Sequence, residues 1–424
     1  ILSVQSVRTH MKKTLRDYQA ELSIKGFEIL KKFGLVYLSM EVRCGKTATA
    51  LEIAYLAGAK NVLFSTKKKA IKSIEGDYKD FGYMEKFKLT VTNDEGLHLV
   101  NDTFDLVIHD EHHRFGAFPK PNKTAKLFRD KYGKLPMIFL SGTPHPESYS
   151  QIFHQFWVKS GFWKKHINFY KWANDYVVKK KKHLGYAEVN DYTEVNPDGM
   201  RIIKKMQELL FISYTQKESG FTSSVKETVL ECELKPKTYD IIKSLKKDLF
   251  YELGNDKIII SDTAVKLQQK LHQLYSGTVK FEDDSSMVID CSKAEFIKHY
   301  FKDKKIAVFY KFKAELDQLK QVFKDDITDD LEIFNDTNKS IACQIVKFRE
   351  GVSLKKADYL VYLNIDFSAV SYFQSRDRLT SFERPSNDVF WIFSNGGIEH
   401  QIYRSVLNKK NYTLSVFKRY NNIK

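Results

Sequence analysis

The chain has 424 residues and a mass of 49.5 kDa, a length that corresponds to roughly two to three domains. Apolar residues make up 42% and charged residues 29% of the sequence, which excludes a disordered chain and leaves enough apolar residues for two cores. The net charge of +16 favours a polyanionic partner such as nucleic acid, although a lysine-rich surface that only keeps the protein in solution would give the same sign.

The sequence has no stretch near the roughly 18 consecutive apolar residues of a membrane-spanning helix, and its first residues lack the apolar run of a signal peptide. We therefore expect a soluble, cytoplasmic protein. The four cysteines form no CxxC pair, which argues against a disulfide framework or a zinc knuckle, and we expect them to be reduced and mostly structural. They are Cys44, Cys232, Cys291 and Cys343.

Short apolar runs that end in polar loops recur in the first third of the chain and predict buried parallel strands. These runs are 35–40, 61–66, 88–92, 105–110 and 137–142. The segment KTATALEIAYLAG lies between the first two runs and predicts a helix. The order strand, loop, helix, strand is that of a doubly wound sheet.

The middle of the chain, about 150–280, is aromatic and basic and predicts mainly helix. Within it, 177–192 favours a hairpin with Gly185 near its turn. A second series of strands is predicted at 305–310, 340–346, 358–365 and 389–394.

The predicted elements indicate an α/β protein of two lobes, each with a parallel sheet flanked by helices. We expect the first lobe over 1–230, with a helical and hairpin insertion at about 150–230, and the second lobe over 231–424.

The segment EVRCGKT (41–47) lies between a predicted strand and a predicted helix. Phosphate binding needs backbone amides at a helix N-terminus, a lysine for the β- and γ-phosphates and a hydroxyl for magnesium, and Gly45, Lys46 and Thr47 supply these groups in the required order. The full pattern GxxxxGK[ST] fails at its first position, where Met40 replaces glycine. A chance turn before a helix is the alternative, but the strand before and the helix after favour a nucleotide site.

A second polar group follows the strand in FDLVIHDEHHRFG, which places Asp110 and Glu111 at the strand's end. In a nucleotide site the first carboxylate can hold magnesium, while the second orients and deprotonates the attacking water. A charged strand end without function is one alternative. A metal site of His109, His112 and His113 is disfavoured, because HExxH is absent and the strand would point these rings in different directions.

Four motifs, taken together in this order, resemble the adenine-recognition motif and motifs I, II and III of the superfamily 2 DExH-box helicases. They are LRDYQ (15–19), the GKT loop, DEHH (110–113) and SGTP (141–144). The chain is most similar to the Swi/Snf-like branch, which commonly lacks the first loop glycine too, and to its small phage-encoded members. The resemblance implies two RecA-like lobes with a cleft between them, and a cytoplasmic, nucleoid-associated protein of a bacterium or a phage-infected host cell.

The resemblance also implies ATP and Mg²⁺ as cofactors. The residues implied to hold the nucleotide in the first lobe are Arg16, Gln19, Arg43, Cys44, Gly45, Lys46 and Thr47, with Gln19 reading the adenine edge. Thr47 and Asp110 would hold magnesium. Lys46, Asp110 and Glu111 would carry hydrolysis, and the groups implied to couple ATP state to lobe movement are His113, Ser141 and Thr143.

In the second lobe, 348–385 resembles motifs V and VI. Gln374 and Arg378 match the glutamine and the first arginine of QxxxRxxR, whereas the second arginine position is Ser381. An arginine that faces the transferred phosphate neutralises the charge developing on it. The resemblance therefore implies catalytic roles for Gln374 and Arg378, with Arg376 and Arg384 as alternative arginines near the nucleotide. A basic helix face in water is the structural alternative.

Further loops resemble the motifs that contact the backbone of a tracked strand. Lys67 and Lys68 belong to a motif Ia-like segment and Thr92 to a motif Ib-like segment, so we expect them to contact phosphates, although each lysine is equally consistent with a solvated side chain. Gly351 and Ser353 would lie in the motif V loop, which senses both nucleotide and strand.

The predicted hairpin at 177–192 is basic and aromatic. Lys179, Lys180, Lys181 and Lys182 make it a candidate wedge that could meet a DNA fork, while an exposed structural hairpin is the alternative.

The leading hypothesis is an ATP-dependent DNA helicase or translocase that remodels or unwinds branched DNA in replication, recombination or repair, for instance by branch migration. One alternative is a duplex translocase that displaces proteins without separating strands. Another is a nucleotide-gated DNA clamp with little turnover, which the altered motif VI leaves open. An RNA helicase also remains an alternative, because such motifs address a backbone.

Overall fold

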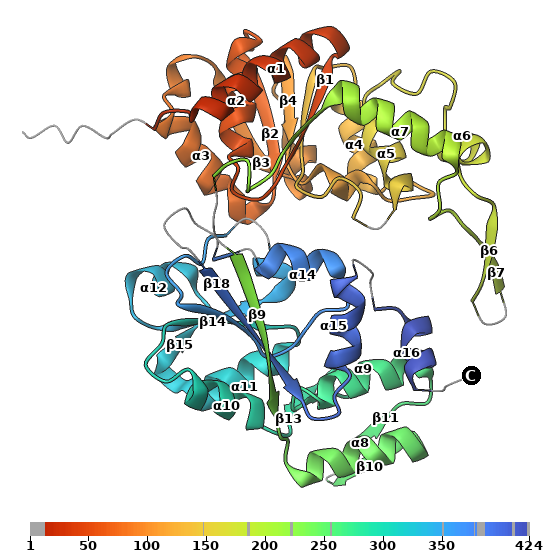
Figure 1. Cartoon of the computed structure of the whole chain (residues 1–424), viewed down its shortest axis with the longest axis vertical. Coiled ribbons are helices and arrows are strands. Elements are labelled where there is room, and N and C mark those ends of the chain that lie inside the picture. The colour runs from red at the N-terminus through yellow and green to blue at the C-terminus, as the bar shows by residue number, and fades with distance from the viewer. Residues whose placement is uncertain are drawn as a thin grey trace, which may run out of the picture. The chain divides into compact units, whose positions relative to one another are not determined.

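The computed structural model describes residues 13–146, 148–184, 187–220, 224–254, 257–349, 352–376, 378–379, 386–408 and 412–421. The chain divides into two compact units, Ile1–Phe221 and Thr222–Lys424. Each unit holds a six-stranded sheet whose neighbouring strands are all parallel (Figure 1). The predicted fold class, α/β with parallel sheets flanked by helices in two lobes, is confirmed.

The sheet of the first unit has the strand order β3-β2-β4-β5-β1-β8. Its strands are β1 (Leu35–Met40), β2 (Asn61–Thr66), β3 (Lys88–Asn93), β4 (Leu106–His109), β5 (Met137–Leu140) and β8 (Phe211–Tyr214). The five strands predicted in this third of the chain are therefore confirmed to within two residues at each end. The central strands β4 and β5 are buried along their whole length, as expected for a parallel sheet covered on both faces.

Helices cover both faces of this sheet. They are α1 (Asp17–Phe33), α2 (Lys46–Leu56), α3 (Ile71–Asp80), α4 (Lys123–Tyr132), α5 (Ile152–Trp157), α6 (Phe169–Tyr176) and α7 (Pro197–Leu210). Alternate strand residues point to opposite faces: Val36 packs with apolar residues of α1, α2 and α3, whereas Tyr37 packs with those of α4 to α7. Two apolar cores thus hold the sheet from its two sides.

The middle of the chain differs from the mainly helical expectation. The predicted hairpin is present as β6 (Lys180–Leu184) and β7 (Ala187–Asp191), which pair antiparallel (Figure 1), while its expected turn at Gly185 lies outside the described residues. In addition, β8 and β9 (Ser224–Cys232) each add an edge strand to a sheet. Edge strands are half exposed, so their mixed polar and apolar residues gave no apolar run in the sequence.

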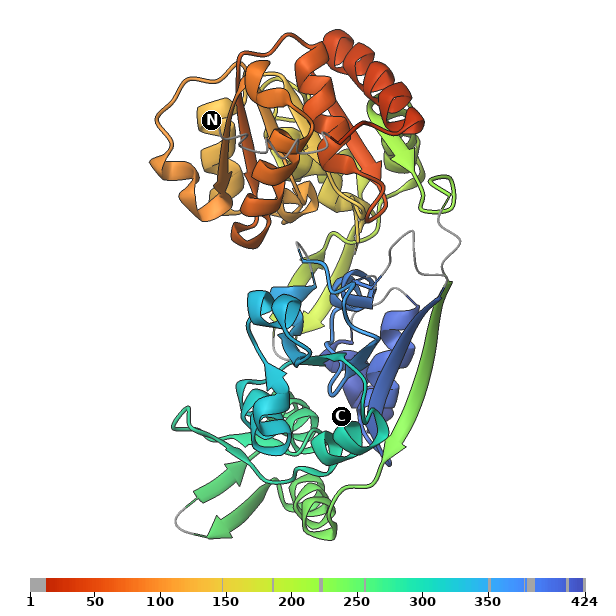
Figure 2. The ribbon, with the colours of Figure 1, turned by 90° about the vertical axis from the view of Figure 1, so that its left-hand side faces the viewer.

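The sheet of the second unit has the strand order β15-β16-β14-β17-β18-β9. Its other strands are β14 (Ile306–Tyr310), β15 (Ile327–Thr328), β16 (Ser340–Gln344), β17 (Tyr359–Tyr362) and β18 (Ser386–Ser394). Figure 2 shows β18 and β9 side by side along the edge of this sheet, paired over nine residues each. Because β9 belongs wholly to this sheet, the boundary between the units falls before it, rather than at residue 230.

Helices again lie on both faces of the second sheet. They are α8 (Pro236–Asp248), α9 (Ala264–Leu274), α10 (Ser292–Tyr300), α11 (Lys313–Phe323), α12 (Leu331–Asp336), α13 (Ile345–Phe348), α14 (Ala369–Arg376), α15 (Glu399–Leu407) and α16 (Leu414–Tyr420). Apolar residues of α10 and α11 form one core, and those of α8, α9, α15 and α16 contribute to the other. Two short antiparallel pairs complete the unit, β10 (Phe250–Gly254) with β11 (Lys257–Ile260) and β12 (Thr278–Lys280) with β13 (Ser286–Val288).

Two carboxylates with low exposure link elements of the second unit. Glu227 on β9 accepts hydrogen bonds from the hydroxyl of Tyr372, at 2.7 Å, and from the indole of Trp391, at 2.9 Å. Glu399 on α15 lies 2.6 Å from the ammonium of Lys293 on α10, and both side chains are at most 1% exposed. A carboxylate in a core is stable only when it is paired in this way.

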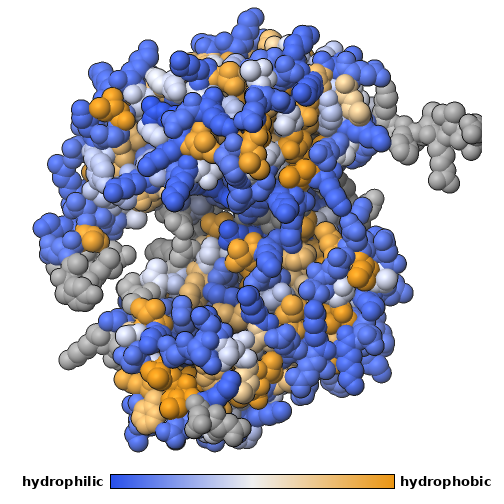
Figure 3. All heavy atoms as spheres, turned by 180° about the vertical axis from the view of Figure 1, so that it is seen from behind, coloured by the Kyte–Doolittle hydropathy of each residue, from blue (hydrophilic) through white to orange (hydrophobic). Residues whose placement is uncertain are grey.

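The surface seen in Figure 3 is mainly hydrophilic, with scattered apolar side chains, as the lysine-rich composition leads one to expect. No helix among the described residues combines the length and the apolar composition needed to cross a membrane. All four cysteines are buried free thiols, which agrees with the prediction of reduced, structural residues.

Candidate functional site

The residues of motifs I, Ia, Ib, II and III all lie at one edge of the first sheet. Since its six strands are parallel, their carboxyl ends meet there, and ligands of open α/β sheets bind outside that edge. The loop 41–45 follows β1, Lys67 follows β2, Asp94 follows β3, Asp110 follows β4 and Ser141 follows β5.

The loop after β1 has the backbone of a phosphate-binding turn. Gly45 has φ of 80° and Arg43 has φ of 67°, both left-handed, and α2 begins directly afterwards at Lys46. Met40 is the fully buried last residue of β1, so the position that is glycine in the full pattern is an ordinary strand residue here. The ammonium of Lys46 donates to the carbonyls of Met40 at 2.9 Å and Glu41 at 3.2 Å.

The segment 15–19, which is predicted to recognise adenine, packs on this loop. A Cβ atom at Gly45 would lie 1.9 Å from Nε2 of Gln19, so only glycine permits this approach. The Gln19 Oε1 atom accepts the backbone N–H of Arg16 at 2.9 Å, and the hydroxyl of Tyr18 donates to the Cys44 carbonyl at 3.2 Å. The two predicted parts of the nucleotide site are therefore brought together.

Cys44 contributes its backbone to the loop. Its side chain is fully buried, its sulfur accepts the hydroxyl of Ser219 at 3.0 Å, and burial raises the pKa of its thiol. A buried, protonated thiol is inert, so any contact of Cys44 with a nucleotide would be through its backbone.

Asp110 is held from two sides. The hydroxyl of Thr66, at the end of β2, donates to Oδ2 at 2.9 Å, and the backbone N–H of Glu111 donates to Oδ1 at 2.9 Å. Burial raises the pKa of Asp110, whereas the Thr66 hydrogen bond and the charge of Lys46 oppose that rise. The hydroxyl of Thr47 and the carboxylate of Asp110 are hard oxygen donors of the kind that magnesium prefers, so these residues suit that ion.

Glu111, His113, Ser141 and Thr143 form one polar group. Glu111 has a left-handed backbone, with φ of 50°, and its Oε2 lies 3.3 Å from Nδ1 of His113. The same nitrogen lies 2.9 Å from Oγ of Ser141, which also accepts the backbone N–H of Thr143 at 3.1 Å. The structure thus places all three predicted coupling residues of the first unit beside the second carboxylate of motif II.

Asp94 is the first residue after β3 and contacts His109 and Arg114, which flank motif II in the sequence. It was not identified from the sequence. It is 5% exposed. Its Oδ1 accepts the hydroxyl of Ser65 at 2.7 Å and lies 3.3 Å from Nε2 of His109, and its Oδ2 lies 2.8 Å from the guanidinium of Arg114. Burial alone would raise its pKa, but His109, Arg114 and Ser65 together lower the pKa of Asp94 to about 2. The carboxylate is therefore ionised at neutral pH.

Both nitrogens of His109 and of His112 lie within hydrogen-bonding distance of protein groups. Nδ1 of His109 lies 2.9 Å from Nδ1 of His112, whose Nε2 lies 2.8 Å from the carbonyl of Gln155. A carboxylate and a carbonyl can only accept, so the three bonds of this chain need three ring protons, one more than two neutral imidazoles carry. Burial lowers the pKa of His112 well below its usual range.

The candidate strand-contact residues lie on neighbouring strand ends. Lys67 is partly buried and Lys68 is exposed, and both follow β2. Thr92 on β3 is in register with Ser65 on β2, so these two ends are adjacent at the carboxyl edge. The predicted contacts of Lys67 and Thr92 thus lie close enough to face the same polyanion.

The hairpin lysines are engaged in exposed ion pairs. Lys180 pairs with Glu194, and Lys181 lies 2.8 Å from Glu188. Lys179 is exposed, whereas the side chain of Lys182 lies outside the described set. Exposed ion pairs contribute little to stability, so they leave the lysines available for exchange with a phosphate.

In the second unit, motif VI is tied to motif V. Arg378 is 6% exposed, donates from Nε to the Gln374 carbonyl at 2.9 Å and from NH1 to the Val352 carbonyl at 3.4 Å. Gln374 is 6% exposed and Ser353 is exposed. Gly351, Ser381 and Arg384 lie outside the described residues.

Arg376, the alternative arginine, has a structural environment. Its NH1 donates to Glu227 at 2.8 Å, and its guanidinium lies 5.2 Å from the ring centre of Tyr372 and 4.8 Å from that of Phe373. If Arg376 moved away from this site, Glu227 would lose its charged partner. Arg376 therefore has a structural role in the second unit.

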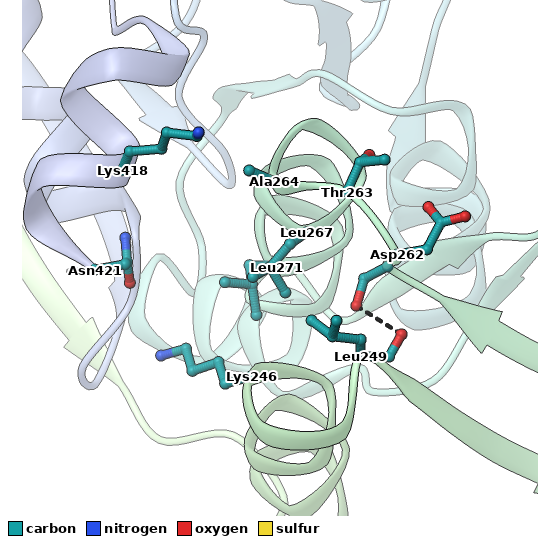
Figure 4. Close-up of a pocket in the computed structure, with 10 residues that line it drawn as sticks. Lys246, Leu249, Asp262, Thr263, Ala264, Leu267, Leu271, Lys418 and Asn421 are labelled. Carbon is teal, nitrogen blue, oxygen red and sulfur yellow. Dashed lines mark hydrogen bonds between the residues drawn. The ribbon is translucent and has the colours of Figure 1, made fainter. Parts of the chain in front are cut away.

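A cavity of about 400 Å³ lies elsewhere in the second unit, between α8, α9 and α16 (Figure 4). Leu267 and Leu271 form an apolar wall, and Lys246 and Lys418 extend toward it from two helices. None of the predicted nucleotide or DNA contacts lines it.

Comparison with known proteins gives a limited result. No protein-family model matches the chain, and no curated protein matches it. Among solved structures, the chain is similar to the SWI2/SNF2 ATPase core of Sulfolobus solfataricus in complex with dsDNA, with 15% identity, a TM-score of 0.40 and coverage of 97% of this chain and 93% of that one. It is also similar to the SWI2/SNF2 ATPase core domain of the same organism, with 14% identity, a TM-score of 0.41 and coverage of 96% and 92%. At this identity and TM-score neither match assigns the chain to a family.

Proposed function

We propose that this protein is a DNA-dependent ATPase that moves along DNA and remodels or unwinds branched substrates. The observation that carries the proposal is the constellation at the carboxyl edge of the first sheet. There the positive charge of Lys46 favours the ionised form of Asp110 and lowers the pKa of its carboxyl group against the effect of burial. Glu111 contacts His113, which contacts Ser141. A lysine on a phosphate-binding turn beside two carboxylates is suited to phosphoryl transfer.

Each residue has a role that follows from its position. The backbone amides at the start of α2 and the ammonium of Lys46 bind the phosphates, and Gln19 recognises the adenine. Thr47 and Asp110 would hold Mg²⁺, which would supply positive charge to the phosphate oxygens. Glu111 accepts a proton from the attacking water, and His113 holds Glu111 in place. The roles implied for Gln374 and Arg378 in hydrolysis remain predictions.

DNA as the polyanion is a proposal that rests on the net charge of +16, on the adjacent strand ends that carry Lys67 and Thr92, and on the resemblance to Swi/Snf-like motors. Basic groups that contact a sugar–phosphate backbone give binding without sequence preference and with a strong dependence on salt. Such contacts suit a protein that moves along its substrate.

The proposal is tested by measuring ATP hydrolysis without nucleic acid and with single-stranded DNA, blunt duplex, forked DNA and RNA, while strand separation is followed in the same samples. We expect the largest stimulation with forked DNA, together with displaced strand. Stimulation by duplex without displacement would identify a duplex translocase. Binding of DNA without stimulated turnover would identify a nucleotide-gated clamp and would contradict the proposal.

The hairpin of β6 and β7 provides a separate prediction. If it acts as a wedge, replacing Lys179, Lys180, Lys181 and Lys182 together by alanine should reduce strand displacement on a fork by about tenfold, while DNA-stimulated ATP hydrolysis changes less than about twofold. The reason is that β6 and β7 form a separate two-stranded sheet, and the described ion pairs of Lys180 and Lys181 are with Glu194 and Glu188. The substitution therefore leaves the six-stranded sheet intact. Replacing the exposed Lys204 and Lys205 on α7 by alanine removes half as many charges and shows how far charge loss alone lowers the two activities. Equal losses of both activities would contradict a wedge.

A further inference from the structure

Asp94 is the point at which the β3 end meets motif II. It is the first residue after β3 and the first of the short 3₁₀ helix Asp94–Leu99. Thr92, the candidate strand contact, precedes it by two residues. The carboxylate points inward, because it is 5% exposed and contacts Ser65, His109 and Arg114, which belong to other segments of the first unit.

The partners of Asp94 enclose the hydrolytic carboxylates in the sequence. His109 directly precedes Asp110, and Arg114 follows Glu111 by three residues. Asp94 lies 3.3 Å from the first and 2.8 Å from the second of these side chains. A single carboxylate thus holds both ends of the segment that carries Asp110 and Glu111.

A second path joins the same strand ends. The Ser65 hydroxyl donates to Asp94 at 2.7 Å, and the next residue, Thr66, donates to Asp110 at 2.9 Å. The loop after β2 begins at Lys67, another candidate strand contact. The ends of β2 and β3 therefore reach motif II through three side chains with ordinary hydrogen-bonding distances.

We propose that Asp94 is a positioning residue that transmits binding of DNA at the β2 and β3 ends to the hydrolytic carboxylates of motif II. This inference rests on the proposed function. A DNA strand that shifts the end of β3 on binding moves the buried, ionised carboxylate of Asp94. The ion pair of Asp94 with Arg114 resists separation, because an unpaired charge in the interior is costly. His109 and Arg114 therefore follow Asp94, and the segment 110–111 between them changes its position relative to Lys46.

The test compares Asp94→Asn with the wild type. Asparagine has the same shape and can still accept the Ser65 hydrogen bond, but it lacks the charge that holds His109 and Arg114. We expect the ratio of ATP hydrolysis with saturating duplex DNA to hydrolysis without DNA to fall by about tenfold, a size typical of coupling between sites. Hydrolysis without DNA should fall much less than hydrolysis with DNA, and the Kd for duplex DNA should change by less than about threefold.

Arg114→Gln is a second variant, because the Arg114 side chain is 32% exposed and its loss is less disruptive to folding. Arg114→Gln should also lower the ratio of hydrolysis with DNA to hydrolysis without DNA. If Asp94→Asn does not fold, the result for Arg114→Gln tests the inference. Asp105→Asn is the control, since Asp105 is a carboxylate of the same unit that accepts the backbone N–H of Lys60 at 2.8 Å, at the amino edge of the sheet. It should leave the ratio unchanged.

The outcomes separate the inference from the proposed function. If DNA does not stimulate ATP hydrolysis by the wild type, both the inference and the proposed function are overturned. A stimulated wild type with an unchanged ratio in Asp94→Asn and Arg114→Gln overturns the inference alone. Equal losses with and without DNA would show that Asp94 serves only to stabilise the fold, which also overturns it.

Discussion

Glu111→Gln should lower the rate of ATP hydrolysis by about 10²–10⁴-fold, the contribution typical of a positioned general base, while nucleotide binding persists. Glutamine has the size of glutamate but cannot take a proton from water. The groups proposed to bind the nucleotide, Lys46 and Gln19, do not depend on Glu111 for their contacts. The measurement is single-turnover hydrolysis of radiolabelled ATP, together with equilibrium binding of a fluorescent ADP analogue.

A glutamate of the same unit provides the control. Glu85 lies on an exposed 3₁₀ helix, Tyr83–Glu85, away from the carboxyl edge, and Glu85→Gln should hydrolyse ATP at the wild-type rate. If Glu111→Gln kept the wild-type rate as well, the proposed role of motif II would be wrong.

Removing one partner of the buried pair Lys293–Glu399 should produce the largest loss of stability. Lys293 donates to Glu399 at 2.6 Å and to the Leu363 carbonyl at 3.2 Å, and it is fully buried. Glu399→Leu leaves an ammonium in the core without its counter-charge, which costs about 3–5 kcal/mol. Urea unfolding of the full chain, followed by tryptophan fluorescence, measures the loss in a background with Trp157, Trp163 and Trp172 replaced by phenylalanine, so that the signal comes from Trp391 of the same unit.

The double variant Lys293→Met with Glu399→Leu tests the cause. Because it removes both charges and fills the space with apolar atoms, it should recover most of the stability lost in Glu399→Leu. The exposed pair Lys298–Asp326, 3.1 Å apart, is the control, and Asp326→Asn should cost at most about 1 kcal/mol. A double variant as unstable as Glu399→Leu would mean that packing, rather than the unpaired charge, sets the loss.

The sequence predicted the strands that are central in each sheet, because a strand covered on both faces must be apolar along its length. The runs at 35–40, 61–66 and 305–310 became β1, β2 and β14 with nearly the same ends. The edge strand β9 was missed, since its polar residues gave it no apolar run. Glu227 on that strand is explained by its contacts with Tyr372, Arg376, Trp391 and Tyr403, which lie 145 to 176 residues away in the chain.

The candidate site likewise contains residues that local sequence patterns predicted and residues that only contacts in space explain. The order of Lys46, Asp110 and Ser141 could be read from local patterns, because each follows an apolar strand and all parallel strands end at one edge. Asp94 could not, because its role depends on His109 and Arg114 approaching it in space. A carboxylate directly after a parallel strand is the one signal that would have drawn attention to it. The ion pair of Arg376 with Glu227 likewise depends on an approach in space that no local pattern shows.

The measurement that tests the central claim most directly is steady-state release of inorganic phosphate from Mg-ATP by the purified chain and by Lys46→Ala, with and without duplex DNA. Lys46 donates to the carbonyls of Met40 and Glu41, and its charge favours the ionised form of Asp110. We therefore expect the wild type to hydrolyse ATP faster when DNA is present, and Lys46→Ala to release no phosphate above background in either condition. Hydrolysis by Lys46→Ala at the wild-type rate, or a wild type that binds neither ATP nor DNA, would contradict the account.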